Sequence, residues 1–187
     1  MTETTTPEIQ ESSKPANAWT TERIVALILL AMLCSILVWK AYHPEDIYLV
    51  DIQYEFLQGS IEFEPKIDEN RHSDAIQIDN TFYPRGLSVK ANNDLRCRFI
   101  PQGYRFFVTE IGMDATLGKD SPASAVFRIM ADGTLLYESP VMTPNMAPRF
   151  VRVSVKGRHE LRLQVHDAGD GDAEDYAHWA MCRFEYR

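Results

Sequence analysis

The sequence predicts an all-β domain, a β-sandwich of jelly-roll type, preceded by a single transmembrane helix. Two observations lead to this fold class. About eight or nine short apolar segments, separated by turn signals, follow residue 43, and no helical run of comparable strength lies among them. Before them, the run Ile24–Trp39 contains no charged residue. The expected parts are a disordered tail over residues 1–22, an anchor over residues 23–42 and a sandwich over residues 43–187.

The tail and the anchor differ in composition. Met1–Trp19 is rich in Thr, Glu and Pro and lacks apolar periodicity, which is typical of disorder. As a helix, Ile24–Trp39 would span roughly 24 Å, a little less than a ~30 Å hydrocarbon core. A helix buried in a globular domain would normally keep a polar face, and this run has none. Side chains that extend the span by snorkelling and interfacial anchoring are Trp19, Arg23, Trp39, Lys40 and Tyr42.

A cleaved signal peptide is the main alternative to an anchor. Cleavage needs small residues at the A-x-A positions, and the stretch from Val38 to Pro44 offers no such pair. Lipoprotein processing at Cys34 would need small residues where Met32 and Leu33 stand. The sequence therefore predicts a retained anchor, with residues 24–39 in the membrane.

Charge suggests the orientation and excludes one class of partner. Lys14 and Arg23 precede the anchor and Lys40 follows it, which slightly favours a cytoplasmic N-terminus and a domain outside the cytoplasm. The net charge is −8, and the domain after residue 42 contains 23 acidic and 16 basic residues. Nucleic acid is not expected as a partner, because phosphate binding needs a basic stripe.

Alternating apolar residues and turn signals place the strands. The dipeptide Asp132-Gly133 is the strongest short-range signal and predicts a hairpin. Lys156-Gly157-Arg158 predicts the turn before the strand that begins at Leu161. The other expected strands are Ile47–Phe56, Ile76–Ile78, Leu87–Ala91, Leu95–Ile100, Arg105–Met113, Ala125–Ala131, Leu135–Glu138, Val151–Val155 and a return strand through Trp179.

A carboxylate-rich loop follows the Leu161 strand. Residues 167–175 contain five carboxylates and two glycines, a composition that no regular element favours. An EF-hand register from Asp170 meets Asp175 where glycine is required and Met181 where a carboxylate is required, so that motif fails. An irregular calcium site at Asp167, Asp170 and Asp172 and a solvated acidic loop are the two remaining alternatives. No other cofactor is expected.

A sugar site needs an aromatic face and a few planar polar groups. Trp179, Tyr176, His178, Asp175 and Asp114 include both kinds of side chain. The alternative interpretation makes Trp179 a core residue and lets Asp175 close a turn through backbone hydrogen bonds.

Six segments follow one another in a fixed order: Tyr48–Asp51, Thr81–Ser88, Arg105–Asp114, Val126–Ser139, Val141–Thr143 and Leu161–Trp179. As an ordered set, they resemble the NPCBM/NEW2 family over about three quarters of the chain. The resemblance implies a galactose-binding-like β-sandwich of a kind often appended to glycoside hydrolases. It also implies carbohydrate binding, which is shown for some members of the family.

The chain departs from this family at polar positions. Lys90 stands where the family has a histidine, and Tyr176 and His178 replace a histidine and an aspartate. Asp114-Ala115 stands where the family has an acidic pair. These changes imply that an inherited ligand site, with Lys90 now part of it, has altered while the fold is retained.

Cys97 and Cys182 lie in expected strands of a domain placed outside the cytoplasm, where disulfides persist. A disulfide and two separate buried thiols are both compatible with these positions. Neither residue belongs to a Cys-x-x-Cys or His-rich cluster, so zinc is not expected.

Two functions fit these observations. One is a tethered, lectin-like module that binds a glycan or envelope polysaccharide. The other is an accessory subunit that docks another envelope protein, with a vestigial sugar site. An enzyme is not expected, because no recognised catalytic motif is present in the sequence.

Overall fold

The computed structural model describes residues 20–42, 44–58, 64–171 and 173–187. The chain divides into two units, residues 1–43 and residues 44–187, and each is described by itself. Most of the expected tail, residues 1–19, lies outside the described residues.

The first unit contains helix α1 (Thr21–Tyr42), whose residues are all exposed. Its 22 residues give a length of about 33 Å at about 1.5 Å per residue, which matches a ~30 Å hydrocarbon core. The helix therefore extends beyond the predicted apolar run at both ends. It is long and apolar enough to cross a membrane, a criterion that an N-terminal signal sequence also meets.

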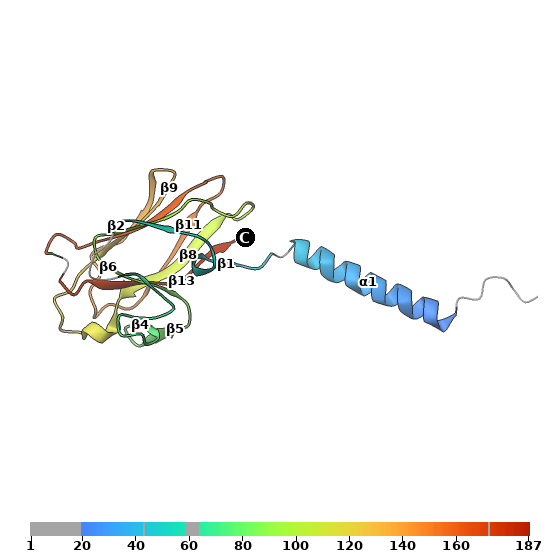
Figure 1. Ribbon diagram of the computed structural model, residues 1–187, viewed down its shortest axis with the longest axis horizontal. Coiled ribbons are helices and arrows are strands. Elements are labelled where there is room, and N and C mark those ends of the chain that lie inside the picture. Colours follow the sequence, from blue (N-terminus) through green and yellow to red (C-terminus); the bar gives the residue numbers. More distant parts are fainter. Residues whose placement is uncertain (1–19, 43, 59–63, 172) are drawn as a thin grey trace, which may run out of the picture. The chain divides into compact units, whose positions relative to one another are not determined.

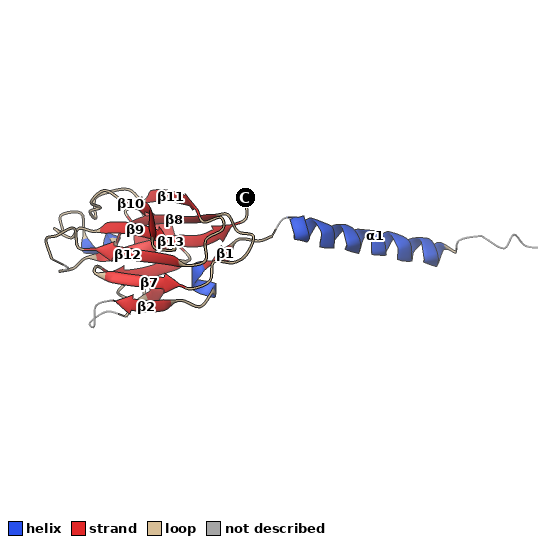
Figure 2. Cartoon of the chain, turned by 90° about the horizontal axis from the view of Figure 1, so that it is seen from above, coloured by secondary structure: helices blue, strands red, loops and turns tan. Residues whose placement is uncertain are grey.

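The second unit is a sandwich of two antiparallel sheets, as the sequence predicts (Figure 1). One sheet has the order β11–β8–β13–β6–β3, with β1 paired to the end of β13. The other has the order β10–β9–β12–β7–β2, which Figure 2 shows as neighbouring ribbons. The strands are β1 (Ile47–Tyr48), β2 (Glu55–Gln58), β3 (Lys66–Ile67), β4 (Ile76–Ile78), β5 (Thr81–Tyr83), β6 (Gly86–Lys90), β7 (Asn93–Cys97), β8 (Phe106–Met113), β9 (Val126–Ala131), β10 (Thr134–Glu138), β11 (Arg149–Ser154), β12 (Leu161–His166) and β13 (Tyr176–Glu185).

The predicted Asp132-Gly133 hairpin is confirmed. β9 ends at Ala131 and β10 begins at Thr134, and these two residues are partners in the ladder. Asp132 and Gly133 have φ angles of 48° and 74°, the positive values that a type I′ turn requires. The Asp132 carboxylate also accepts backbone hydrogen bonds from His159 and Glu160, which lower its pKa below the ordinary value.

The single strand predicted over Ile47–Phe56 is wrong. β1 pairs with β13 in one sheet, a 3₁₀ turn follows at Leu49–Asp51, and β2 pairs with β7 in the other sheet. The chain therefore changes sheets within ten residues, and Leu49 is fully buried at the crossing. Alternation along the sequence does not reveal such a crossing, because both short strands keep an inward-facing side.

The core lies between the two sheets. β9 and β12 supply it from one side and β8 and β13 from the other, with alternate residues inward. Its members include Phe107, Ile111, Phe127, Ile129, Leu163, Val165, Trp179 and Phe184.

The hairpin β4–β5 packs outside the sandwich, on the outer face of the sheet that contains β8 and β13 (Figure 1). Ile76, Ile78 and Tyr83 form a small second cluster with Ala180 there. A Cβ atom on Gly112 of β8 would lie 2.3 Å from Cγ2 of Ile78, so only glycine lets the hairpin approach this closely.

The disulfide considered between Cys97 and Cys182 is not formed. Both thiols are free and buried, and they belong to β7 and β13, strands of opposite sheets. Facing sheets lie roughly 10 Å apart, whereas a disulfide needs Cα atoms within about 7 Å. Burial raises the pKa of Cys182 to about 12 and also raises the pKa of Cys97.

Candidate functional site

Four of the predicted site residues meet at one end of the β8–β13–β6 sheet, which we call the distal end. Lys90, the last residue of β6, is the ladder partner of Tyr176, the first residue of β13. Asp114 follows β8, and its backbone N–H donates to the Tyr176 carbonyl oxygen over 3.0 Å. His178 lies two residues further along β13, on the same face of that strand as Tyr176. The fold thus gathers three segments that are distant in sequence.

A buried polar chain runs behind this end of the sheet. The Ser88 hydroxyl donates to the carbonyl oxygen of Glu69, so Nδ1 of His178, 2.8 Å from Oγ of Ser88, must be the donor toward that oxygen. Nε2 of His178 then faces Oδ1 of Asp114 at 3.7 Å. Both His178 and Asp114 are completely buried.

The buried Ser88, His178 and Asp114 side chains are the residue types of a Ser-His-Asp triad, but their hydrogen bonds run in the opposite direction. A nucleophilic serine must donate its proton to the histidine, whereas the Ser88 proton is committed to a backbone carbonyl. Ser88 is also only 2% exposed, so a substrate has no access to its hydroxyl. The arrangement holds β6, β8 and β13 together at the distal end and does not form a nucleophile.

Asp114 anchors the short turn that follows β8. Its Oδ1 accepts hydrogen bonds from the backbone N–H of Thr116 over 2.8 Å and from the Thr116 hydroxyl over 2.7 Å. Burial raises the pKa of the Asp114 carboxyl. The neighbouring His178 imidazole and the Thr116 donors together lower that pKa by more than burial raises it. The net pKa therefore lies below the ordinary value. Oδ2 of Asp114 and Nε2 of His178 have no hydrogen-bond partner among the described residues.

The accessible part of the distal end is the Tyr176 cluster, formed by Arg71, Lys90, Thr116 and Tyr176. The Arg71 guanidinium lies over the Tyr176 ring, 5.0 Å from its centroid. It also donates to the Thr116 hydroxyl over 3.2 Å and to the Thr116 carbonyl oxygen over 3.3 Å. Sequence reasoning missed Arg71 and Thr116, because each lies in an irregular segment where no spacing points to a partner.

Trp179 and Asp175 do not belong to this surface. Trp179 is 1% exposed and packs edge-to-face against Phe127, with ring centroids 5.1 Å apart. Trp179 is therefore a core residue and not a sugar platform. Asp175 is buried as well, and its Oδ1 accepts the backbone N–H of Ser124 over 2.8 Å. Asp175 thereby fixes the start of β13 against the segment before β9, a contact between residues 51 positions apart and not the local turn that the alternative interpretation describes.

Two carboxylates of the acidic loop, Asp167 and Asp170, bind groups within the protein. Asp167 accepts hydrogen bonds from the backbone of Gly169 and the side chain of Asn92, and Asp170 accepts one from the Ser124 hydroxyl. Asp172, the third residue of the calcium hypothesis, lies outside the described residues. Over the ranges that the structure describes, no group of three or more His, Cys, Asp or Glu side chains is placed to hold a metal ion.

The domain has the same kind of β-sandwich as the CBM51 modules, a galactose-binding-like fold. A CBM51 module of Clostridium perfringens GH95, solved in complex with methyl-galactose, superposes with a TM-score of 0.69 and 21% identity over 75% of this chain and 99% of that one. CBM51-2 of C. perfringens ZmpB, solved with GlcNAc, gives a TM-score of 0.68 and 24% identity over 75% of this chain and 31% of that one.

Residues 45–185 match the NPCBM/NEW2 domain family, and the chain belongs to that family. A curated relative from Renibacterium salmoninarum, named "Putative endo-alpha-N-acetylgalactosaminidase", is 26% identical over 146 residues. That match covers 75% of this chain and 10% of the relative, so the chain spans about a tenth of that protein's length.

Proposed function

We propose that this protein is a membrane-anchored, non-catalytic module that binds a glycan outside the cytoplasm through the Tyr176 cluster. The observation that carries the proposal is the composition of this cluster on an NPCBM/NEW2 fold. A partly exposed tyrosine ring lies beside Lys90 and Arg71, side chains that can donate to sugar hydroxyls. The buried His178–Asp114 contact supports this surface from behind and ties it to rigid strands.

The glycan is the expected partner because of what the similar structures bind. The two C. perfringens modules were solved with methyl-galactose and with GlcNAc, respectively. Their identities to this chain are low, so the particular sugar does not transfer with the fold. The altered positions Lys90, Tyr176 and His178 favour the alternative, an accessory subunit that docks another envelope protein.

The non-catalytic part of the proposal rests on the described polar clusters. The Ser88–His178–Asp114 chain is buried and is oriented against nucleophilic attack. The relative named as a hydrolase is about ten times longer than the stretch it shares with this chain, which leaves ample room for a separate catalytic domain in that protein.

Anchoring is proposed from α1. Its 22 residues, its exposed apolar surface and the Trp39 and Lys40 side chains near its C-terminal end suit a retained membrane span. Lys14 and Arg23 precede residues 24–39 and Lys40 follows them, which slightly favours a cytoplasmic N-terminus.

The test is a glycan array probed with residues 44–187, the unit that has its own core. Tyr176→Ala and Lys90→Met should each weaken binding to the retained glycan at least tenfold, because each removes a contact from the proposed surface. Phe150→Ala is the matched control, since Phe150 is an exposed aromatic residue on the edge strand β11, outside the cluster.

If the wild-type domain binds no glycan on the array, the result contradicts the proposal and favours the accessory subunit that docks another envelope protein. Binding that survives both cluster substitutions would move the sugar site elsewhere on the domain.

A further inference from the structure

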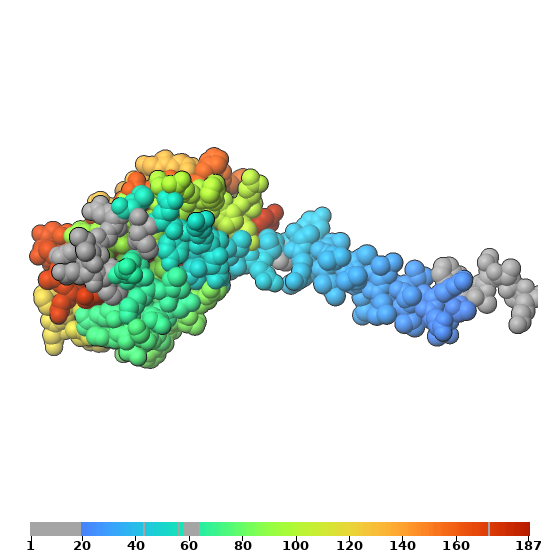
Figure 3. Space-filling view, in the orientation of Figure 1, coloured from blue at the N-terminus to red at the C-terminus, as the bar shows by residue number. Residues whose placement is uncertain are grey.

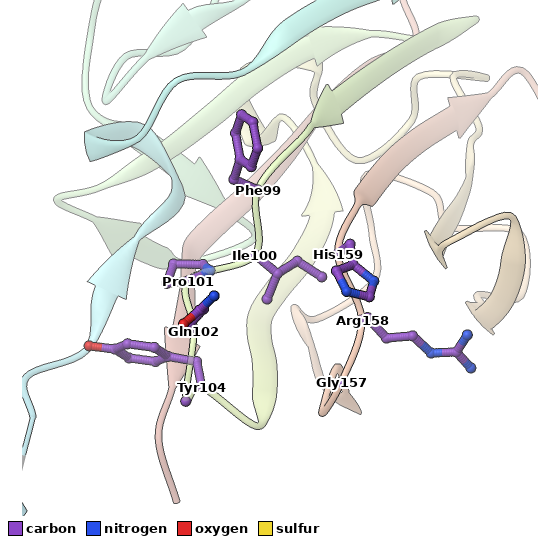
Figure 4. A pocket seen from close by; sticks show the side chains of 9 residues that line it. Phe99, Ile100, Pro101, Gln102, Tyr104, Gly157, Arg158 and His159 are labelled. Carbon is purple, nitrogen blue, oxygen red and sulfur yellow. The ribbon is translucent and has the colours of Figure 1, made fainter.

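The end of the sandwich opposite the Tyr176 cluster carries a second distinct surface, which we call the basal face. Two loops form it, Phe99–Tyr104 before β8 and Lys156–His159 before β12, next to the segment Pro44–Asp46 that leads into β1. A hollow of about 570 Å³ lies between the two loops. Figure 4 shows Ile100 extending toward His159, Tyr104 extending toward the incoming segment, and Arg158 pointing away from both.

The basal face is held in one arrangement by hydrogen bonds between its loops. The backbone N–H of Ile100 donates to the carbonyl oxygen of His159 over 2.9 Å, and that of Val155 donates to Arg105 over 2.8 Å. The Tyr104 hydroxyl donates to the carbonyl oxygen of Glu45 over 2.5 Å, which fixes the incoming segment on the same face. The Arg183 guanidinium of β13 also donates to the Asp46 carboxylate over 3.1 Å, which holds the same segment against the end of β13. Figure 3 shows the surface of the domain from the side of Figure 1.

Three cations on the basal face are not held in ion pairs. The side chains of Arg105, Lys156 and Arg158 make no hydrogen bond or ion pair in the part of the chain that the structure describes, although Arg158 is near enough to Asp132 to contribute to the lowered pKa of that carboxyl. The acidic groups nearby are already engaged: Asp46 pairs with Arg183, and Glu185 pairs with Arg152 and Arg183. Glu160 pairs with Arg96, Asp132 accepts backbone N–H groups, and Glu45 also has a partner. An unpaired positive surface is unexpected on a domain with more acidic than basic residues.

An apolar side chain projects from the first loop of the basal face. Phe99 is 79% exposed, more than any other large apolar side chain in the described part of the domain. A single exposed apolar side chain is common on protein surfaces, and Phe99 is accessible to a partner. Cations and an exposed aromatic ring at the same end of the domain match a phospholipid surface, where headgroup phosphates meet the first acyl carbons.

The linker between α1 and the domain is short. Four residues separate the end of α1 from the start of β1, and a linker this short reaches at most about 18 Å. A bilayer that held α1 would therefore lie within reach of the loops that join the incoming segment.

We propose that the basal face docks on anionic phospholipid headgroups of the membrane that holds α1, with Phe99 at the acyl boundary. Arg105, Lys156 and Arg158 contact the phosphates, and the Tyr176 cluster at the other end of β13 is directed away from the bilayer. This proposal goes beyond glycan binding and rests on the proposed anchoring.

The test uses the full chain in vesicles, with a fluorescent label at one introduced cysteine on a Cys34→Ser background. Gln102→Cys places the label on the exposed part of the basal face, and Ala173→Cys places it in the exposed loop at the distal end. Quenching by spin-labelled phospholipid reports contact with the bilayer. Vesicles of phosphatidylcholine alone are compared with vesicles that also contain phosphatidylglycerol.

The label at Gln102 should be quenched in the anionic vesicles and much less in the neutral vesicles. The label at Ala173 should not be quenched in either kind of vesicle. Lys156→Gln with Arg158→Gln should lower the docked-to-undocked ratio about 30-fold, since one Lys or Arg near an anionic surface contributes about fivefold. Arg149→Gln is the matched control, because Arg149 is also an exposed cation without a partner in the described residues but begins β11 near the distal end.

A flotation assay tests the anchoring through α1 separately from the docking of the basal face. Chain that does not float with either kind of vesicle would refute the anchoring and, with it, the docking. Chain that floats but shows equal quenching in both lipids, or quenching unchanged by Lys156→Gln with Arg158→Gln, would refute the docking alone. Protection of the label at Gln102 from a water-soluble quencher by a sulfated polysaccharide, and not by anionic vesicles, would assign the face to an anionic glycan.

Discussion

Replacing Trp179 by alanine tests whether the distal strand β13 is built on a core residue. Trp179 is 1% exposed, lies in the strand between β6 and β8, and contacts the Phe127 ring edge-to-face across the sandwich. Emptying a large aromatic site costs roughly 3–5 kcal/mol. A domain of this size typically has about 5–15 kcal/mol of stability, so Trp179→Ala should remain folded but lose a large part of it.

The measurement is urea unfolding of residues 44–187, followed by far-ultraviolet circular dichroism. With a slope of about 2 kcal/mol per molar urea, the midpoint should fall by about 2 M. Tryptophan fluorescence cannot follow the unfolding of the Trp179→Ala variant, because Trp179 is the only tryptophan after residue 42. In the wild-type domain that same tryptophan should emit at short wavelength and resist a water-soluble quencher.

A matched control and a double-mutant cycle sharpen the result. Phe82→Ala removes an aromatic side chain that is 67% exposed, and it should change the unfolding free energy by less than about 0.5 kcal/mol. Trp179→Ala combined with Phe127→Ala should reveal a coupling of about 0.5–1.5 kcal/mol for the ring pair. A loss below about 1 kcal/mol for Trp179→Ala, with binding of a glycan abolished, would refute the core assignment and restore Trp179 as a sugar platform.

Three further predictions follow from the structure. Gly112→Ala should lower the unfolding midpoint, because its Cβ would meet Ile78, and Ile78→Ala should recover much of the loss in the double variant; two independent, additive losses would contradict this packing. The folded pKa of Asp114 lies below the unfolded value of about 3.9, so its ionised form adds stability above about pH 4 that is lost as the pH falls through the folded pKa. Asp114→Asn, which cannot ionise, should therefore show a shallower loss of unfolding free energy on acidification, and parallel curves for the two proteins would show that the carboxylate adds nothing. Protease added to intact cells should degrade the β-domain and spare the N-terminal tail, whereas a mature chain that begins after α1 would indicate a cleaved signal sequence.

The sequence by itself determined the features that depend on near neighbours. Asp132-Gly133 predicts its hairpin because two adjacent residues that tolerate positive φ are sufficient for a type I′ turn. The alternation from Leu161 to His166 predicts β12 because one face of that strand is buried and the other is not. The length and composition of α1 predict a membrane span, since both are properties of one continuous segment.

Only the tertiary structure decided how distant segments meet. Trp179 and Tyr176 are three residues apart in sequence, yet alternation along β13 buries the first in the core and leaves the second at the surface. Arg71 lies over Tyr176 because the loop before β4 covers the outer face of β13, a contact between residues 105 positions apart that no local pattern encodes. The sequence of residues 47–56 predicts one strand because apolar residues alternate in both halves of the segment. The two halves are separate strands because β1 and β2 pair with different sheets. Local sequence thus sets the conformation of each segment, whereas the composition of a site depends on long-range packing that brings unrelated loops to the same end of a sheet.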